Sequence, residues 1–204
     1  MNRIAIIGAG GHTRSAINIL KANYKNHLIE IFDDTFEQDA DERICGLKVV
    51  GKIEDILPNT QVFLAIGDNE KRGKFAEMFE SVLIKENICH NKSFIEENVS
   101  LGESNQIFAN TYINSGAKIG NNNIINTNAI IEHEVVIGSN NHISVGSIVC
   151  GRVTIGDSCM LGAGAVIIDK ISICDNVIIG AGAVVVSNIT KSGTYIGTPA
   201  IKVK

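Results

Sequence analysis

The sequence predicts a small α/β domain with a parallel sheet, followed by a parallel β-helix. Two observations support this prediction. An aliphatic residue occupies every sixth position sixteen times in succession from Ile95 to Val185, and strand-like runs alternate with helix-like runs before residue 90. Neither an α-helix nor an isolated strand has a period of six, whereas a hexapeptide repeat is typical of a parallel β-helix. We therefore predict domains at residues 1–90 and 91–204.

The first domain reads as a Rossmann-type fold. The expected elements are strands at 3–7, 28–32 and 62–66, a helix over 15–20, and a second helix whose apolar residues are Phe75, Met78, Phe79 and Val82. Alternating strands and helices of this kind form a parallel sheet covered by helices.

A glycine-rich turn, Gly8-Ala-Gly10-Gly11-His12, joins the first strand to the first helix. Backbone N–H groups at such a junction favour phosphate, and an acidic residue after the second strand, here Asp33 or Asp34, commonly binds a ribose hydroxyl. Thr13 stands where the dinucleotide fingerprint has its third glycine, which counts against NAD. The alternative is a simple tight turn with a solvated acidic loop.

The β-helix also carries a longer period of eighteen residues, visible in segments such as Leu101-Gly-Glu, Ile119-Gly-Asn and Ile137-Gly-Ser. Eighteen is three hexads, so each coil should have three strands and three corners. One outward face is expected to be apolar throughout, with Phe94, Tyr112, Ile130, Ile148, Val166 and Val184. An exposed apolar strip usually marks an interface, which predicts a homo-oligomer, most simply a trimer.

Composition narrows the function classes. The chain of 204 residues has a net charge of −4 and no basic run, so no nucleic-acid footprint is present. No segment is apolar and long enough to span a membrane, and the initial apolar run is too short for a secretory signal. Five cysteines without a Cys-x-x-Cys pair argue against disulfides and structural zinc, and favour the cytoplasm.

Two histidines are candidates for chemistry in the β-helix. His133 is expected at a corner between Glu132 and Glu134, and His142 on the outside of the third face. Histidine titrates near neutrality and serves as a general base, and an adjacent carboxylate can orient it. The alternative is a solvated corner with a surface histidine. A three-histidine zinc site lacks the expected spacing, so we predict no metal.

Several motifs together resemble a known family. They are Gly8-Ala-Gly-Gly-His12, Phe32-Asp-Asp34, Ala65-Ile-Gly-Asp-Asn-Glu-Lys-Arg72, Ile125-Asn-Thr-Asn-Ala-Ile-Ile-Glu-His-Glu134 and Gly197-Thr-Pro-Ala200. Across essentially the whole chain, the sequence resembles the bacterial sugar O-/N-acyltransferases. This family contains sialic acid O-acetyltransferases and UDP-4-amino-sugar N-acetyltransferases, and has a left-handed β-helix.

The resemblance implies a homotrimer that uses acetyl-CoA and a UDP-amino sugar, with no metal. It implies His133 as catalytic base and Glu134 as its carboxylate partner. The residues implied for acetyl-CoA are His142, Gly151, Gly164, Gly180 and Gly182. Those implied for the sugar nucleotide are Gly10, His12, Asp33, Asp34, Asn69, Arg72 and Asn126.

The resulting prediction is N-acetylation of the 4-amino group of a UDP-linked 4-amino-4,6-dideoxy sugar, supplying bacillosamine-like, lipopolysaccharide or glycoprotein glycans. The nearest alternative is O-acetylation of sialic or legionaminic-type acids. Two alternatives from other classes are a zinc hydratase on the same β-helix and a non-catalytic scaffold.

Overall fold

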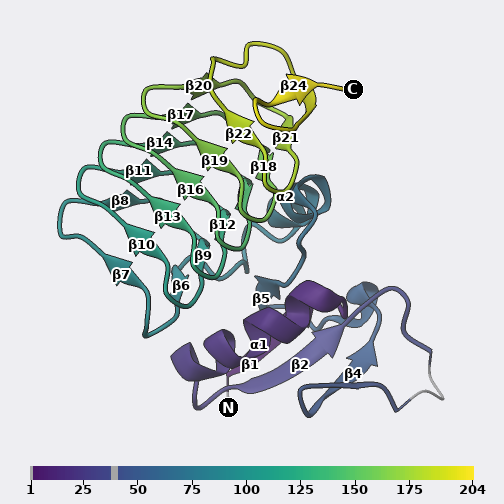
Figure 1. Ribbon diagram of the computed structural model, residues 1–204. Coiled ribbons are helices and arrows are strands. Elements are labelled where there is room, and N and C mark those ends of the chain that lie inside the picture. Colours follow the sequence, from purple (N-terminus) through teal and green to yellow (C-terminus); the bar gives the residue numbers. More distant parts are fainter. Residues whose placement is uncertain (1, 38–40) are drawn as a thin grey trace. The chain divides into compact units, whose positions relative to one another are not determined.

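A computed structural model describes residues 2–37 and 41–204 (Figure 1). It divides the chain into two compact units, Met1–Lys85 and Glu86–Lys204. The short strand β6 (Ile88–Cys89) pairs in parallel with β9 (Gln106–Ile107), so the first coil of the second unit already includes β6.

The first unit contains a five-stranded sheet in the order β3-β4-β2-β1-β5. Its strands are β1 (Arg3–Ile7), β2 (Leu28–Phe32), β3 (Arg43–Ile44), β4 (Leu47–Gly51) and β5 (Gln61–Leu64). The central strand β1 pairs in parallel with β2 and β5, which confirms the three expected strands. The sequence pattern did not reveal β3 and β4, or the 3-10 turn η1 (Ile53–Asp55).

Helices α1 (Gly11–Asn23) and α2 (Asn69–Met78) follow β1 and β5. The side chain of Asp68 caps α2 by accepting a hydrogen bond from the N–H of Lys71 at 2.8 Å. The expected second helix extended to Val82, but α2 ends before Phe79. Phe79 and Val82 still pack against the same apolar core from the segment after the helix, which explains their helix-like spacing.

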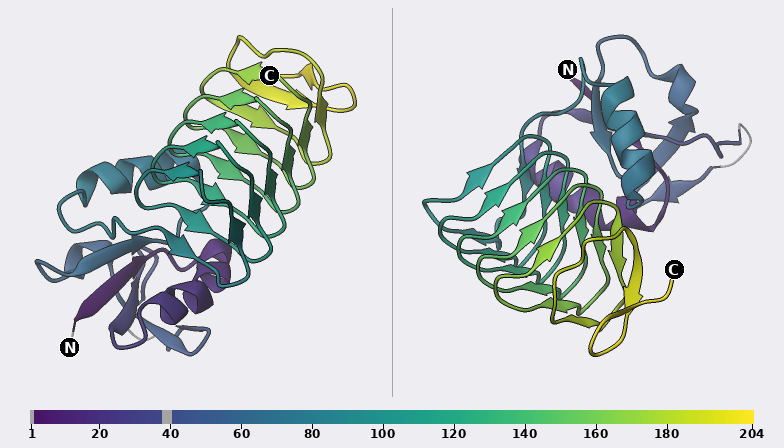
Figure 2. Two further views of the ribbon diagram at one scale, coloured as in Figure 1. Left: turned by 90° about the vertical axis from the view of Figure 1, so that its left-hand side faces the viewer. Right: turned by 90° about the horizontal axis from the view of Figure 1, so that it is seen from above.

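The second unit is a parallel β-helix whose coils follow one another from teal to yellow in Figure 1 and in both views of Figure 2. Its left-handed hexapeptide fold has three faces. Face 1 consists of β7 (Phe94–Ile95), β10 (Tyr112–Ile113), β13 (Ile130–Ile131), β16 (Ile148–Val149), β19 (Val166–Ile167) and β22 (Val184–Val185).

Face 2 consists of β8 (Ser100–Leu101), β11 (Lys118–Ile119), β14 (Val136–Ile137), β17 (Thr154–Ile155) and β20 (Ser172–Ile173). Face 3 contains β6, β9, β12 (Ile124–Ile125), β15 (His142–Ile143), β18 (Met160–Leu161), β21 (Val177–Ile179), β23 (Gly193–Ile196) and β24 (Ile201–Lys202). Between neighbouring coils, strands pair eighteen residues apart, as in Tyr112 with Ile130. The antiparallel strand β24 ends face 3.

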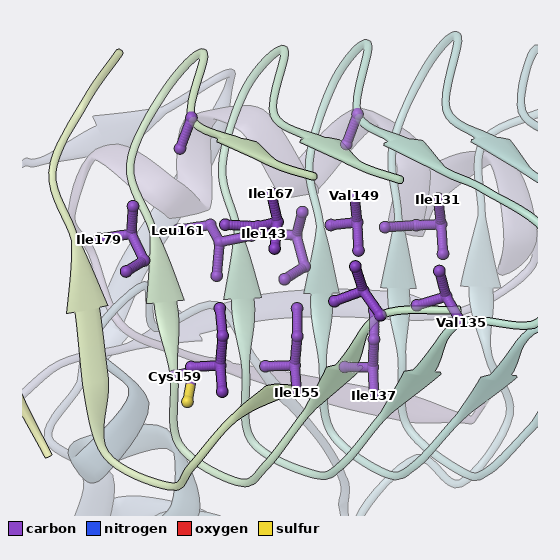
Figure 3. Close-up of a cluster of buried hydrophobic side chains, with 14 of the residues drawn as sticks. Ile131, Val135, Ile137, Ile143, Val149, Ile155, Cys159, Leu161, Ile167 and Ile179 are labelled. Carbon is purple, nitrogen blue, oxygen red and sulfur yellow. The ribbon is translucent and has the colours of Figure 1, made fainter. Parts of the chain in front are cut away.

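The repeat aliphatics fill the interior of the β-helix, where Ile131, Val149 and Ile167 stack in one column (Figure 3). The small residues two positions before a repeat aliphatic are also fully buried: Ala117, Ala129, Ser147, Cys159, Ala165 and Ala183. Burial of apolar area on this scale is the main stabilising contribution to such a fold.

A buried asparagine ladder runs along the corner between faces 2 and 3. Asn123 donates from Nδ2 to Asn105 Oδ1 at 3.0 Å and to the carbonyl of Gly138 at 2.9 Å. Its own Oδ1 accepts the N–H of Asn141 at 2.8 Å, and Asn141 Oδ1 accepts the N–H of Cys159 at 2.6 Å. The side-chain amides therefore satisfy backbone groups from one coil to the next.

Face 1 is apolar, as expected from the sequence. Phe94 is 59% exposed and stacks on Tyr112 with ring centroids 5.8 Å apart, while the other outward side chains of the face are partly exposed. On face 3 the equivalent outward residues Gln106, Ile124 and His142 are buried, so the expected exposure of His142 is wrong, whereas Met160 and Ile178 are exposed.

Candidate functional site

His133 and Glu134 lie at the corner between faces 1 and 2, which we call corner 1–2 (residues 96–99, 114–117, 132–135, 150–153 and 168–171). The ring nitrogen Nδ1 of His133 is 3.1 Å from Glu134 Oε2. Both side chains are substantially exposed, at 42% and 62%. A carboxylate on Nδ1 stabilises the tautomer that carries its proton there, which leaves Nε2 free to accept a proton.

Glu134 reaches this position because its backbone is in the left-handed region, with φ of +59°. Its N–H donates to the carbonyl of Ser115 in the preceding coil at 3.1 Å. On the other side of the histidine, Glu132 accepts hydrogen bonds from Asn114 Nδ2 at 2.8 Å and from the N–H of His133 at 3.3 Å. The pair is therefore held by the coil before it and by its own corner.

Gly151 lies one coil after His133 and provides space for the imidazole. A Cβ atom at Gly151 would be 2.6 Å from His133 Nε2, 2.7 Å from Cε1 and 3.0 Å from Asp169 Oδ1. The backbone of Gly151 is outside the left-handed region, so the requirement for glycine here is spatial. The column His133-Gly151-Asp169 follows from the eighteen-residue period.

The other predicted acetyl-CoA residues lie elsewhere on the β-helix. Corner 3–1 (residues 108–111, 126–129, 144–147, 162–165 and 180–183) connects face 3 to face 1 and contains Asn126 and the predicted glycines Gly164, Gly180 and Gly182. Gly164 and Gly182 have φ of +68° and +66° and open space where a Cβ would project. Gly180 instead has Ile196 Cγ2 at 2.7 Å from that point.

Asn126 and His142 are brought together, with Asn126 Nδ2 3.2 Å from His142 Nε2. His142 was expected on the outer surface, yet it is only 9% exposed within the chain. The predicted residues of the β-helix thus form two groups on either side of the apolar face 1, one at corner 1–2 and one at corner 3–1 together with His142 of β15.

The first unit contains a pocket of about 680 Å³ at the carboxyl ends of β1, β2 and β5. It lies at the topological switch point of the sheet, where β2 pairs with one edge of β1 and β5 with the other. This is the usual ligand site of such folds. The predicted residues Gly10, His12, Asp33 and Asp34 all line it. Lys71 lines it too, and Ile53, Ile66, Phe75 and Met78 contribute apolar surface.

The glycine turn is fixed to its sheet by side chains. Gly8 has φ of +109°, and a Cβ there would be 3.1 Å from the carbonyl oxygen of Ala65. Thr13 Oγ1 donates to the carbonyl of Gly8 at 2.7 Å and to that of Ala65 at 3.3 Å. Thr13, in place of a third glycine, therefore joins the ends of β1 and β5.

Asp33 organises the loop around the pocket. Its Oδ2 accepts the N–H of Ala9 at 2.7 Å, and its Oδ1 accepts from the N–H and the hydroxyl of Thr35 at 2.9 and 2.6 Å. Partial burial alone would raise the pKa of Asp33, but these hydrogen bonds and the charge of Lys71 hold it below the ordinary value of 3.8. Asp33 thus has few acceptor sites left for a ligand, and Asp34 is the better candidate for a ribose hydroxyl.

Arg72 and Asn69 are not among the residues lining the pocket. Arg72 is fully buried; its NH1 donates to the carbonyls of Ile66 and Gly67 at 3.2 and 3.3 Å, and its NH2 to Asn69 Oδ1 at 2.8 Å. Burial lowers the pKa of Arg72 to about 10. The two residues hold the loop after β5 in shape.

Sequence reasoning overlooked Arg152, whose Nε lies 3.4 Å from Glu134 Oε2. The eighteen-residue period could have revealed it, because Arg152 follows Glu134 by one coil. Within residues 2–37 and 41–204, no three His, Cys, Asp or Glu side chains are grouped to hold a metal ion. Over the same described residues, no helix is long and apolar enough to cross a membrane.

Comparison with known proteins identifies the family. Residues 3–79 match the family model described as the PglD N-terminal domain, and residues 152–187 match the bacterial transferase hexapeptide repeat. The structure of PerB from Caulobacter crescentus, in complex with CoA and GDP-perosamine, is 32% identical in sequence. It superposes with a TM-score of 0.88 over 100% of this chain and 98% of that one. The chain belongs to the bacterial sugar O-/N-acyltransferase family.

Two further proteins are similar to this chain. UDP-N-acetylbacillosamine N-acetyltransferase of Bacillus subtilis is 30% identical over 115 residues, and the match spans about half of its length (52%) and 53% of this chain. The acetyltransferase domain of PglB from Neisseria gonorrhoeae is 24% identical, with a TM-score of 0.87 over the whole of both chains, and shares the fold.

Proposed function

We propose that this acyltransferase transfers an acetyl group from acetyl-CoA to the 4-amino group of a UDP-linked 4-amino-4,6-dideoxy-N-acetyl sugar. The observation that carries the proposal is the His133 ring, with Glu134 on Nδ1 and the space over Gly151 beside Nε2. The relatives support an amine acceptor, since both perosamine and bacillosamine enzymes are N-acetyltransferases by name.

His133 acts as the general base. The amine attacks the thioester carbonyl, the C–N bond forms, and Nε2 takes a proton from the nitrogen. The C–S bond then breaks, and the proton passes to the departing thiolate of CoA. Glu134 orients the ring and stabilises the imidazolium. A positioned base of this kind contributes about 10²- to 10⁴-fold, and holding both substrates in one cleft contributes more.

The reaction site is formed between subunits of a homotrimer that packs through face 1. Support comes from the apolar character of this face and from the two groups of residues at the corners beside it. Packing by face 1 brings corner 1–2 of one subunit to corner 3–1 of its neighbour. His133 of one subunit then faces the open glycines Gly164 and Gly182 of the next, with Asn126 and His142 nearby.

Acetyl-CoA lies along this cleft. No atom lies within 4 Å of the position that a Cβ of Gly164 or Gly182 would take. Acetyl-CoA can therefore come close to the backbone groups of these two glycines. Gly151 leaves room for the His133 ring itself, while Gly180 is packed against Ile196. Five free cysteines fit a reducing compartment, which we take to be the cytoplasm.

The pocket of the first unit binds the nucleotide end of the sugar substrate. The N–H groups at Gly10, Gly11 and His12 at the start of α1 suit its phosphates, because a helix N-terminus favours anions. Asp34 binds the ribose, and Asp33, Asn69 and Arg72 keep the surrounding loops in place. We propose UDP as the nucleotide, although one similar structure contains GDP-perosamine.

A thiol-release assay tests the proposal, with UDP-4-amino-sugars, GDP-perosamine, and sialic and legionaminic acids as acceptors. We expect CoA release with a UDP-amino sugar and at least a 100-fold lower kcat in His133→Ala. His90→Ala, a change of another histidine in the same unit, should retain full activity. Release with only the nonulosonic acids would instead establish the O-acetyltransferase alternative, and no release with any acceptor would refute both.

A further inference from the structure

Arg152 shares a carboxylate oxygen with the base. Its Nε lies 3.4 Å from Glu134 Oε2, and His133 Nδ1 lies 3.1 Å from the same oxygen. The two nitrogens are therefore at most about 6.5 Å apart, the sum of these distances. A fixed positive charge stands close to the group whose protonation controls the proposed reaction.

The β-helix backbone fixes this arrangement. Glu134 and Arg152 occupy equivalent corner positions in successive coils, and both have φ of +59°. The N–H of Arg152 donates to the carbonyl of His133 at 3.0 Å. On the other side of Glu134 the equivalent position is Gly116, which has no side chain to compete for the carboxylate.

We propose that Arg152 is a positioning residue that sets the pH range in which His133 works as a base; this role rests on the proposed function. Its guanidinium holds the Glu134 carboxylate in place, and its positive charge partly neutralises the negative charge of that carboxylate. The proton on His133 is thereby less stabilised, and the neutral imidazole that accepts a proton is present at lower pH.

Other charged groups also face His133 and set the background for this effect. Glu132 lies at the same corner as His133, next to Cys150 of the following coil. Asp169 lies on the far side of Gly151 from His133. Lys170 pairs with Asp169 at 3.4 Å. Arg152 is the cation that contacts the carboxylate on Nδ1, so its removal should act most directly on the ring.

The experiment is an NMR titration of the His133 imidazole in the full-length protein, with His133→Asn used to assign the signal. Arg152→Gln removes one charge at this separation, so the His133 signal should titrate at higher pH than in the wild type at low salt. The shift should shrink in 1 M salt, because such charges are then screened. Arg152→Lys keeps the charge and should titrate much closer to the wild type than Arg152→Gln does.

Lys191→Gln is the matched control, since it removes one charge from an exposed side chain of the same unit. It should leave the His133 titration unchanged. Coincident curves for Arg152→Gln and wild type, or an equal shift in Lys191→Gln, would overturn the proposal. The acidic limb of kcat/KM should move to higher pH by the same amount in Arg152→Gln, and an unmoved limb would equally overturn it.

These readouts separate the two hypotheses. An inactive wild-type protein would refute the proposed function, yet the NMR titration would still report whether Arg152 controls His133. An active protein with an unshifted titration in Arg152→Gln would refute the role of Arg152 alone.

Discussion

Gly151→Ala should separate activity from stability at the proposed base. The new Cβ would lie 2.6 Å from His133 Nε2, whereas ordinary van der Waals contact begins at 3.4 Å. The ring must therefore retreat by roughly 0.8 Å, and a misplacement of about 1 Å can lower a rate by about 10²-fold. That factor corresponds to about 2.7 kcal/mol of transition-state stabilisation.

Stability should change little, because the side chain of His133 is 42% exposed and can swing outward. Alanine also adopts the backbone conformation of Gly151 without strain. We expect the free energy of urea unfolding to fall by no more than about 1 kcal/mol.

The assay is kcat for CoA release, measured in Gly151→Ala, His133→Ala and the double variant. The two changes act on one group, so Gly151→Ala should cost nothing further when His133 is absent. Wild-type turnover in Gly151→Ala, or an additional 100-fold loss in the double variant, would show that Gly151 does not act by leaving room for the His133 ring.

Three further predictions concern the β-helix. Asn123→Ala should lower the free energy of unfolding by about 3 kcal/mol, because three buried hydrogen bonds of the ladder are lost; an unchanged urea midpoint would contradict this. Burial raises the pKa of Cys159 from 9.0 to about 11. Between pH 9 and 11 the thiol therefore ionises in the unfolded chain but not in the folded one, so the stability that is fully present below pH 9 is lost as pH rises to 11. A fall of roughly 3 kcal/mol is expected over that range, and in Cys159→Ala this component should disappear. If face 1 forms the proposed trimer, Ile148→Lys should be monomeric in sedimentation where the wild type is trimeric, and an intact trimer in the variant would exclude face 1 as the interface.

The period of six was sufficient to predict the β-helix because each coil must bury one aliphatic per strand. The asparagine ladder is not evident from the sequence, because asparagine is also common at the corners of a β-helix. Asn105, Asn123 and Asn141 occupy inward positions two residues before a repeat aliphatic, where their amides serve buried backbone groups. A polar residue at such a position looks like a turn signal in sequence alone.

The composition of the site was only partly predictable. Sequence motifs gave His133 and Glu134 as neighbours, and their contact needs no long-range information. The family resemblance implied Arg72 as a residue that binds the sugar nucleotide, but it lies buried against backbone carbonyls. Its role depends on how the loop after β5 folds back, which hydrophobic periodicity does not encode.

Acetylation of an amine with His133 as the base is the reaction proposed for this protein. Its most direct test is mass spectrometry of the product formed from ¹³C-acetyl-CoA and a UDP-4-amino sugar, before and after treatment with neutral hydroxylamine. We expect one labelled acetyl group that survives hydroxylamine, as an amide does, and at least 100-fold slower labelling by His133→Ala. An acetyl group removed by hydroxylamine, or equal labelling by the variant, would contradict it.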